Sequence, residues 1–252
     1  SIDIYIAADA TFSGAWWNDD TPVNIYILEG AVLTYCEAGW DDKVKIKKAT
    51  KVYCWGNITT PDNMGLRLYD AGLLHIYDAE GEPFYVKANN NTVNNNNAYS
   101  SFQVDPASDF YCEREMYVEG TALLNGGKTH TTNKVTIGKD LYVEGAAGVT
   151  FDDCVYVLRE LDFKSSRSAV VNINKYLQTN TLLTNQGVGT MNLKDALFEI
   201  MSDGMFVDKG SQRIVVNGVE ATYKSVVKVG GKLYFDRGNE YTNVPGDVAA
   251  AA

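Results

Sequence analysis

The sequence has little of what most catalytic and metal sites need, with only two histidines, four cysteines and five prolines among 252 residues. No CxxC pair is present, so a zinc site is not expected. A catalytic triad would need His75, which lies in an apolar strand pattern, or His130, which lies in a threonine-rich polar bend. No P-loop, HExxH, GxSxG or EF-hand motif occurs. We therefore expect no metal, no cofactor and no catalytic residue.

Long apolar runs and long basic runs are also missing. No stretch approaches the roughly 18–20 apolar residues that a membrane helix needs. The one cluster of lysines, at 43–48, alternates with Val44 and Ile46, which is typical of the solvated face of a strand. The formal net charge is −10. Because an acidic chain repels phosphate backbones, nucleic-acid binding is not expected.

What the sequence does contain is a recurring short strand that combines aliphatic residues with tyrosine. Residues 116–120 read Met-Tyr-Val-Glu-Gly and residues 141–145 read Leu-Tyr-Val-Glu-Gly, 25 positions later, while Tyr5 and Tyr26 are 21 apart. Recurrence at about 20–25 residues indicates stacked coils. The predicted fold is all-β, a single-stranded β-solenoid (β-helix) with Gly, Asp and Asn turns. The alternative is a two-domain β-sandwich, which also uses short, regularly spaced strands.

No shift in composition marks a linker, so we expect one β-solenoid domain at 1–242. The asparagine-rich stretch 88–98 is expected to be a loop extruded from one coil. Residues 243–252 are expected to form a flexible tail. Around 193–201 the apolar residues fit both an amphipathic helix and a strand pattern, and the neighbouring strands favour a strand.

The cysteines follow a pattern of their own. Cys36, Cys54 and Cys112 each follow a tyrosine, and the first two are 18 residues apart. We therefore expect Cys36 and Cys54 at equivalent places on adjacent coils. Inward-facing cysteines that pack as small hydrophobic residues are the favoured interpretation. A Cys36–Cys54 disulfide is the alternative, and the redox state of these three and of Cys154 is left open.

The four tryptophans all lie in the first 55 residues, and two of them precede aspartate doublets. Aromatic faces beside carboxylates suit a sugar, whose C–H face stacks while its hydroxyls find acceptors. The alternative is that the tryptophans cap the end of the solenoid core. The predicted ligand-binding residues are Trp16, Trp17, Asp19, Asp20, Trp40, Asp41, Asp42 and Trp55.

Acidic doublets also permit an enzymatic interpretation. Stacking could bring together the pairs at 19–20, 41–42 and 152–153, and polysaccharide cleavage needs clustered carboxylates. However, paired aspartates at turns are more commonly solvated and turn-forming. The charged residues at 113–115 and 159–160 are interpreted as surface ion pairs. A polysaccharide lyase or hydrolase is therefore the least favoured class.

One stretch resembles a known family. Residues 134–157, Lys-Val-Thr-Ile-Gly-Lys-Asp-Leu-Tyr-Val-Glu-Gly-Ala-Ala-Gly-Val-Thr-Phe-Asp-Asp-Cys-Val-Tyr-Val, resemble the coil repeats of secreted β-solenoid proteins of Gram-negative gut bacteria, in particular LruC-domain surface proteins. Residues 191–200 look like a second repeat unit of that family. The resemblance covers 100–235 well and 2–86 loosely. It implies a β-solenoid outside the cell or on the outer-membrane surface, without catalytic residues to carry over.

The favoured function is a non-catalytic extracellular or cell-surface scaffold for adhesion or display, because stacked strands make a stiff rod with long lateral surfaces. The alternative is a carbohydrate-binding module that uses the N-terminal Trp/Asp edge. The expected partners are cell-surface or host glycans or proteins. The oligomeric state is left open.

Overall fold

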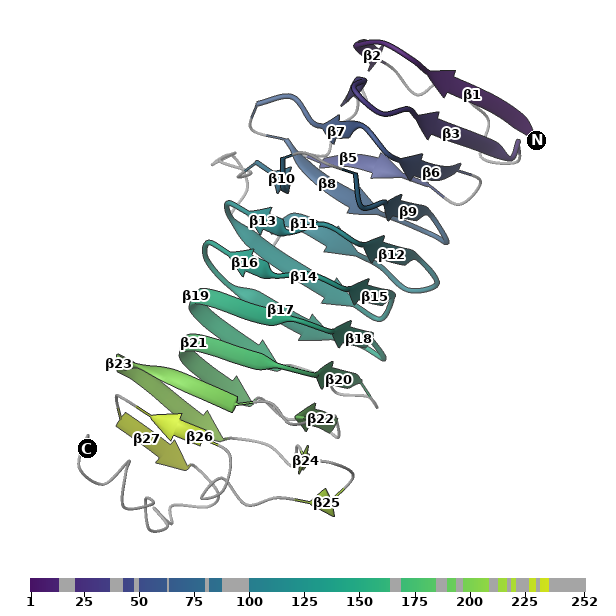
Figure 1. Ribbon diagram of the computed structural model, residues 1–252. Helices are drawn as coiled ribbons and strands as arrows, with labels where there is room; N and C mark the ends of the chain where they lie inside the picture. The colour runs from purple at the N-terminus through teal and green to yellow at the C-terminus, as the bar shows by residue number, and fades with distance from the viewer. Residues whose placement is uncertain are drawn as a thin grey trace.

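The structure, a computed structural model, is an all-β solenoid of parallel stacked strands, as the repeats predict (Figure 1). It describes residues 1–13, 21–36, 43–47, 50–62, 64–79, 82–87, 100–163, 169–184, 190–193, 197–208, 213–216, 219–220, 227–229 and 232–235. Beyond residue 180 it describes the backbone alone. Within these ranges, no helix is long and apolar enough to cross a membrane.

Sheet A forms one continuous face of the solenoid, with eleven strands in chain order. Its strands are β1 (Ile2–Ile6), β3 (Val23–Ile27), β6 (Thr50–Cys54), β9 (Leu73–Ile76), β12 (Asp109–Cys112), β15 (Lys128–Thr131), β18 (Gly148–Phe151), β20 (Val170–Ile173), β22 (Thr190–Leu193), β24 (Arg213–Val216) and β25 (Val219–Glu220). Every pair is parallel except β24–β25. Because the intervening chain returns to this face once per coil, equivalent positions line up along the axis.

The other faces are built by sheets B and C. Sheet B consists of β2 (Ala10–Ser13), β4 (Val32–Cys36) and β7 (Asn57–Thr59). Sheet C has thirteen strands: β5 (Lys43–Ile46), β8 (Gly65–Leu68), β10 (Phe84–Val86), β11 (Ser100–Val104), β13 (Met116–Val118), β14 (Thr121–Asn125), β16 (Val135–Ile137), β17 (Leu141–Glu144), β19 (Cys154–Phe163), β21 (Tyr176–Thr184), β23 (Leu197–Asp208), β26 (Val227–Val229) and β27 (Lys232–Phe235). The two halves of β19 pair with β16 and β17, so sheet C turns a corner there.

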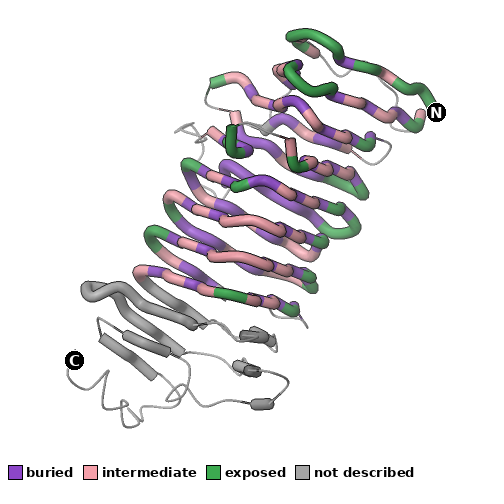
Figure 2. The backbone as a smooth tube through the Cα atoms, in the orientation of Figure 1, coloured by how far each residue is buried: buried purple, intermediate pink, exposed green. Residues whose placement is uncertain are grey.

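The core lies between the sheets because alternate side chains point inward. In β3, Val23, Ile25 and Ile27 are buried, whereas Asn24 and Tyr26 are half-buried on the outer side. The same alternation continues from coil to coil (Figure 2). Each coil thus places an apolar layer on the next, which is how a solenoid builds a core without a globular centre.

The register confirms one repeat seen in the sequence and corrects another. Tyr5 pairs with Tyr26, so their 21-residue spacing is one coil. The similar phrases at 116–120 and 141–145 are not equivalent, because β13 and β17 lie on opposite sides of the corner in sheet C: β13 pairs with β16, and β17 pairs with β14. The successor of Tyr117 one coil later is Thr136, and Tyr142 follows Leu123. The 25-residue spacing therefore crosses from one side of this corner to the other.

Other local predictions are confirmed or lie outside the described ranges. The lysine-rich strand is β5, with Val44 and Ile46 buried and Lys45 half-buried. In the ambiguous segment 193–201, the described residues, 193 and 197–201, lie in strands, as favoured. The predicted loop at 88–98 and the predicted tail at 243–252 lie outside the described residues.

The four cysteines are free thiols. The predicted equivalence of Cys36 and Cys54 is wrong. Cys36 ends β4 in sheet B, whereas Cys54 ends β6 in sheet A. Instead Cys54 and Cys112 both pair with Ile76, from opposite sides, and both are fully buried. The favoured interpretation, a small inward hydrophobic residue, therefore holds for Cys54 and Cys112.

Burial should make these two thiols inert in the folded protein. Desolvation raises the pKa of both Cys54 and Cys112 to about 12. Far below that pH they stay protonated, and the thiol is a poor nucleophile. We expect an alkylating reagent at pH 8 to label Cys54 and Cys112 only after denaturant is added, as read by peptide mass spectrometry. Rapid labelling of both in native buffer would contradict the inward placement.

Candidate functional site

Six successive strands of sheet A carry an aromatic or imidazole ring at the same outward position. The row consists of Tyr5, Tyr26, Tyr53, His75, Tyr111 and His130, one from each of β1, β3, β6, β9, β12 and β15. Trp55 and Tyr77 lie beside it in a second row, one position beyond the ends of β6 and β9. We call these eight residues the aromatic strip. Parallel pairing in register aligns them along the solenoid axis.

The first three rings of the strip are nearly parallel and follow one another along the axis. The centroids of Tyr5 and Tyr26 are 4.8 Å apart at 13°, and those of Tyr26 and Tyr53 are 5.3 Å apart at 13°. Carbon atoms of touching rings approach to about 3.5–4.0 Å. The centroids here are farther apart than that, so the rings follow the strand spacing of about 4.8 Å rather than a tight face-to-face stack. Tyr5, at the end of the row, is 64% exposed.

The middle of the strip is a tighter cluster. The Trp55 and Tyr77 rings stack at 4.2 Å with an angle of 2°, and His75 packs on Tyr77 at 3.8 Å. Tyr111 is turned by 75° from His75 and by 87° from His130. The strip therefore changes from stacked to edge-to-face packing at β12.

A groove of about 470 Å³ lies on sheet A where the aromatic row ends. Its lining includes the outward residues Leu73, His75, Asp109, Tyr111, Lys128, His130, Gly148, Thr150 and Asn172. Gly148 is exposed, and a Cβ placed there would have open space around it. The groove forms because β18 presents only Gly148 and Thr150 beside the larger side chains of β15.

Carboxylates hold both imidazoles in place. His75 Nε2 is 2.8 Å from Glu113 Oε1, and His130 Nε2 is 2.7 Å from Asp152 Oδ2. Asn174 donates a further hydrogen bond to Asp152. Each imidazole has a second ring nitrogen that can bond a ligand hydroxyl. The interpretation of position 130 as a polar bend is wrong, because His130 lies within β15.

Arg114 supports the second row from inside the solenoid. Its Nε donates to the Tyr77 carbonyl at 2.7 Å, and its other nitrogens donate to the Trp55 carbonyl and to Asn57 Oδ1. The residue is only 5% exposed. The interpretation of 113–115 as surface ion pairs is therefore wrong for Arg114. The sequence did contain a signal for this burial, because residue 114 continues the alternation that places residues 110 and 112 inside the solenoid.

The acidic doublet at 152–153 is divided between different partners. Asp152 is hydrogen-bonded to His130 and to Asn174. Asp153 instead forms an ion pair with Lys175, at 2.6 Å. The hydrogen bond from Lys175 lowers the pKa of Asp153. Within the described part of the chain, no group of three or more His, Cys, Asp or Glu side chains could hold a metal ion.

Of the ligand-binding residues predicted from sequence, Trp55 belongs to the strip. The remaining seven, Trp16, Trp17, Asp19, Asp20, Trp40, Asp41 and Asp42, lie outside the described residues. The tyrosine and histidine row was missed as a site, although the 21-residue spacing of Tyr5 and Tyr26 was its signal.

The chain matches no family model, no curated protein and no solved structure. Its fold and its surface nevertheless define a class: a parallel β-solenoid in which side chains in register form an extended outward strip.

Proposed function

We propose that the protein is a non-catalytic extracellular or cell-surface scaffold that binds a neutral linear polysaccharide along the aromatic strip. The observation that carries the proposal is the row itself, with a ring at one outward position on six successive strands. The placement outside the cell rests on the resemblance of residues 134–157 to secreted solenoid repeats.

The dimensions of the strip favour an extended ligand. Neighbouring strands lie about 4.8 Å apart, so six strands span about 24 Å along the axis. A linear glycan offers ring after ring with apolar C–H faces, and the strip offers one outward ring per strand at a comparable repeat. A small isolated ligand would use only one or two of these rings. The repetition therefore suits a chain.

The polar groups beside the strip suit hydroxyls rather than charged groups. Asp109 and Lys128 are paired neighbours at the groove, so both signs of charge are present there. Thr150 and Asn172 add a hydroxyl and an amide. With a net charge of −10, the whole molecule repels polyanions. These features support a neutral glycan.

The two carboxylates that contact the imidazoles of the strip support binding rather than cleavage. Glycoside hydrolysis commonly uses two carboxyl groups that flank the scissile bond. Here Glu113 and Asp152 each bond a different imidazole. This arrangement fixes ring positions, which is what a binding surface needs.

Replacing one ring of the groove should weaken glycan binding selectively. We expect Tyr111→Ala to reduce affinity for a bound neutral polysaccharide by about tenfold, because a ring contact of about 1.4 kcal/mol is lost. The measurement is electrophoresis through native gels that contain each of a panel of neutral polysaccharides.

The matched control is Tyr69→Ala, which removes a 43%-exposed tyrosine that follows β8 in sheet C and packs on Arg67. It should retain wild-type mobility shifts. Equal retardation of wild type and Tyr111→Ala, or no retardation by any polysaccharide, would leave the strip as structural stacking and overturn the proposed function.

A further inference from the structure

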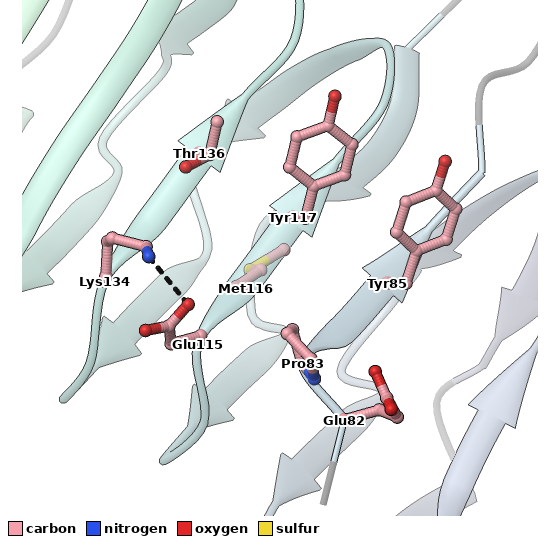
Figure 3. Close-up of a pocket in the computed structure, with 8 residues that line it drawn as sticks. All are labelled: Glu82, Pro83, Tyr85, Glu115, Met116, Tyr117, Lys134 and Thr136. Carbon is pink, nitrogen blue, oxygen red and sulfur yellow. Dashed lines mark ion pairs between the residues drawn. The ribbon is translucent and has the colours of Figure 1, made fainter.

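A second hollow, of about 420 Å³, lies on another face of the solenoid, over β10, β13 and β16 (Figure 3). Its lining is Glu82, Pro83, Tyr85, Glu115, Met116, Tyr117, Lys134 and Thr136. None of these residues belongs to the aromatic strip, since sheet A contributes nothing to the lining.

Two tyrosines form the centre of this hollow. The Tyr85 and Tyr117 rings are nearly parallel, at 13°, with centroids 5.3 Å apart. Figure 3 shows the two rings side by side and turned the same way, and Tyr85 is 45% exposed. On the next strand, the residue paired with Tyr117 is Thr136, whose side chain is short. The pair, which we call the tyrosine platform, therefore offers an open aromatic surface.

Carboxylates outnumber cations around the tyrosine platform. Glu82 is exposed just before β10, and Glu115 is 2.8 Å from Lys134. Glu119 accepts a hydrogen bond from the Tyr85 hydroxyl. The pKa of Tyr85 is raised mainly by burial and further by this hydrogen bond. The phenol therefore stays protonated as the donor. Among the lining residues, two carboxylates against one ammonium leave one net negative charge.

We propose that the tyrosine platform binds a sugar ring that carries a protonated amine, such as a hexosamine unit with a free amino group. The C–H face of such a ring stacks on Tyr85 and Tyr117. Its ammonium is attracted both by the ring faces and by the surplus carboxylates. Uronic acids and sulfated sugars are repelled by the same charges. This site does not depend on the aromatic strip.

A matched pair of ligands isolates the amine. Oligomers of glucosamine and of N-acetylglucosamine share the ring and linkage, but only the first is cationic. We expect calorimetry to show tighter binding of the glucosamine oligomer, with affinity about tenfold lower in Tyr117→Ala. Glu82→Gln should weaken it about threefold, the scale of an exposed ion pair.

Two controls separate this site from general attraction to an acidic protein. Glu29→Gln removes the same charge from the exposed turn after β3 and should leave affinity unchanged. Neutral-polysaccharide binding by Tyr117→Ala should equal that of wild type, which separates this proposal from the strip. Equal binding of the two oligomers, or equal losses in Glu82→Gln and Glu29→Gln, would overturn the proposal even if Tyr117→Ala does not fold.

Discussion

Arg114→Ala is expected to lower the free energy of unfolding by about 3 kcal/mol, measured by urea denaturation. Arg114 is buried and donates to the carbonyls of Trp55 and Tyr77 and to Asn57. Without the guanidinium these acceptors lose their donor, and each orphaned buried polar group costs about 1–3 kcal/mol. Because two of the three belong to strip residues, glycan binding should also weaken.

The chain offers a matched control and a graded variant. Lys87→Ala removes an exposed cation that pairs with Asp62, and it should change stability by less than about 1 kcal/mol. Arg114→Lys keeps the charge but cannot reproduce the planar fork of donors, so an intermediate loss is expected. A loss below about 1 kcal/mol for Arg114→Ala would show that Arg114 does not anchor the second row.

Gly148→Trp is expected to abolish measurable polysaccharide binding while leaving the melting temperature unchanged. Gly148 lines the groove, and an added Cβ has open space around it. A side chain there enters the groove rather than the core, so it blocks ligand without the strain of overpacking. The measurement pairs native-gel retardation with thermal unfolding.

Ala146→Trp is the control for this substitution. Ala146 is exposed in the turn before β18 and is not part of the groove lining. It adds the same indole two positions away and should bind as wild type does. Full binding by Gly148→Trp would show that the ligand does not occupy the groove.

The solenoid could be predicted because its repeats leave a period in the sequence, but the assignment of residues to faces could not. Faces of one coil use the same apolar-Tyr-apolar pattern, so Tyr117 and Tyr142 look equivalent although they lie on opposite sides of the corner in sheet C. A period alone reports the coil length, and only the pairing register tells which positions stack.

The strip could be predicted in part. The spacing of Tyr5 and Tyr26 matches one coil, but His75 and Tyr111 are 36 residues apart because their coil contains the asparagine-rich segment. The change from tyrosine to histidine also hides the row, since a planar aromatic ring is kept but the residue type is not. The burial of Arg114 could not be predicted, because a charged side chain is normally expected at the surface. Here three hydrogen-bond acceptors offset the cost of burying its guanidinium.

The most direct test of the account is calorimetry with neutral oligosaccharides of increasing length, cut from the polysaccharide that the protein retains most strongly. If the ligand lies along the aromatic strip, affinity rises with each added ring until about 24 Å is covered and then levels off. The Tyr111→Ala variant should show a shallower rise. Affinity that does not change with oligosaccharide length would mean that the protein binds a single sugar unit. That result would contradict binding along the solenoid axis.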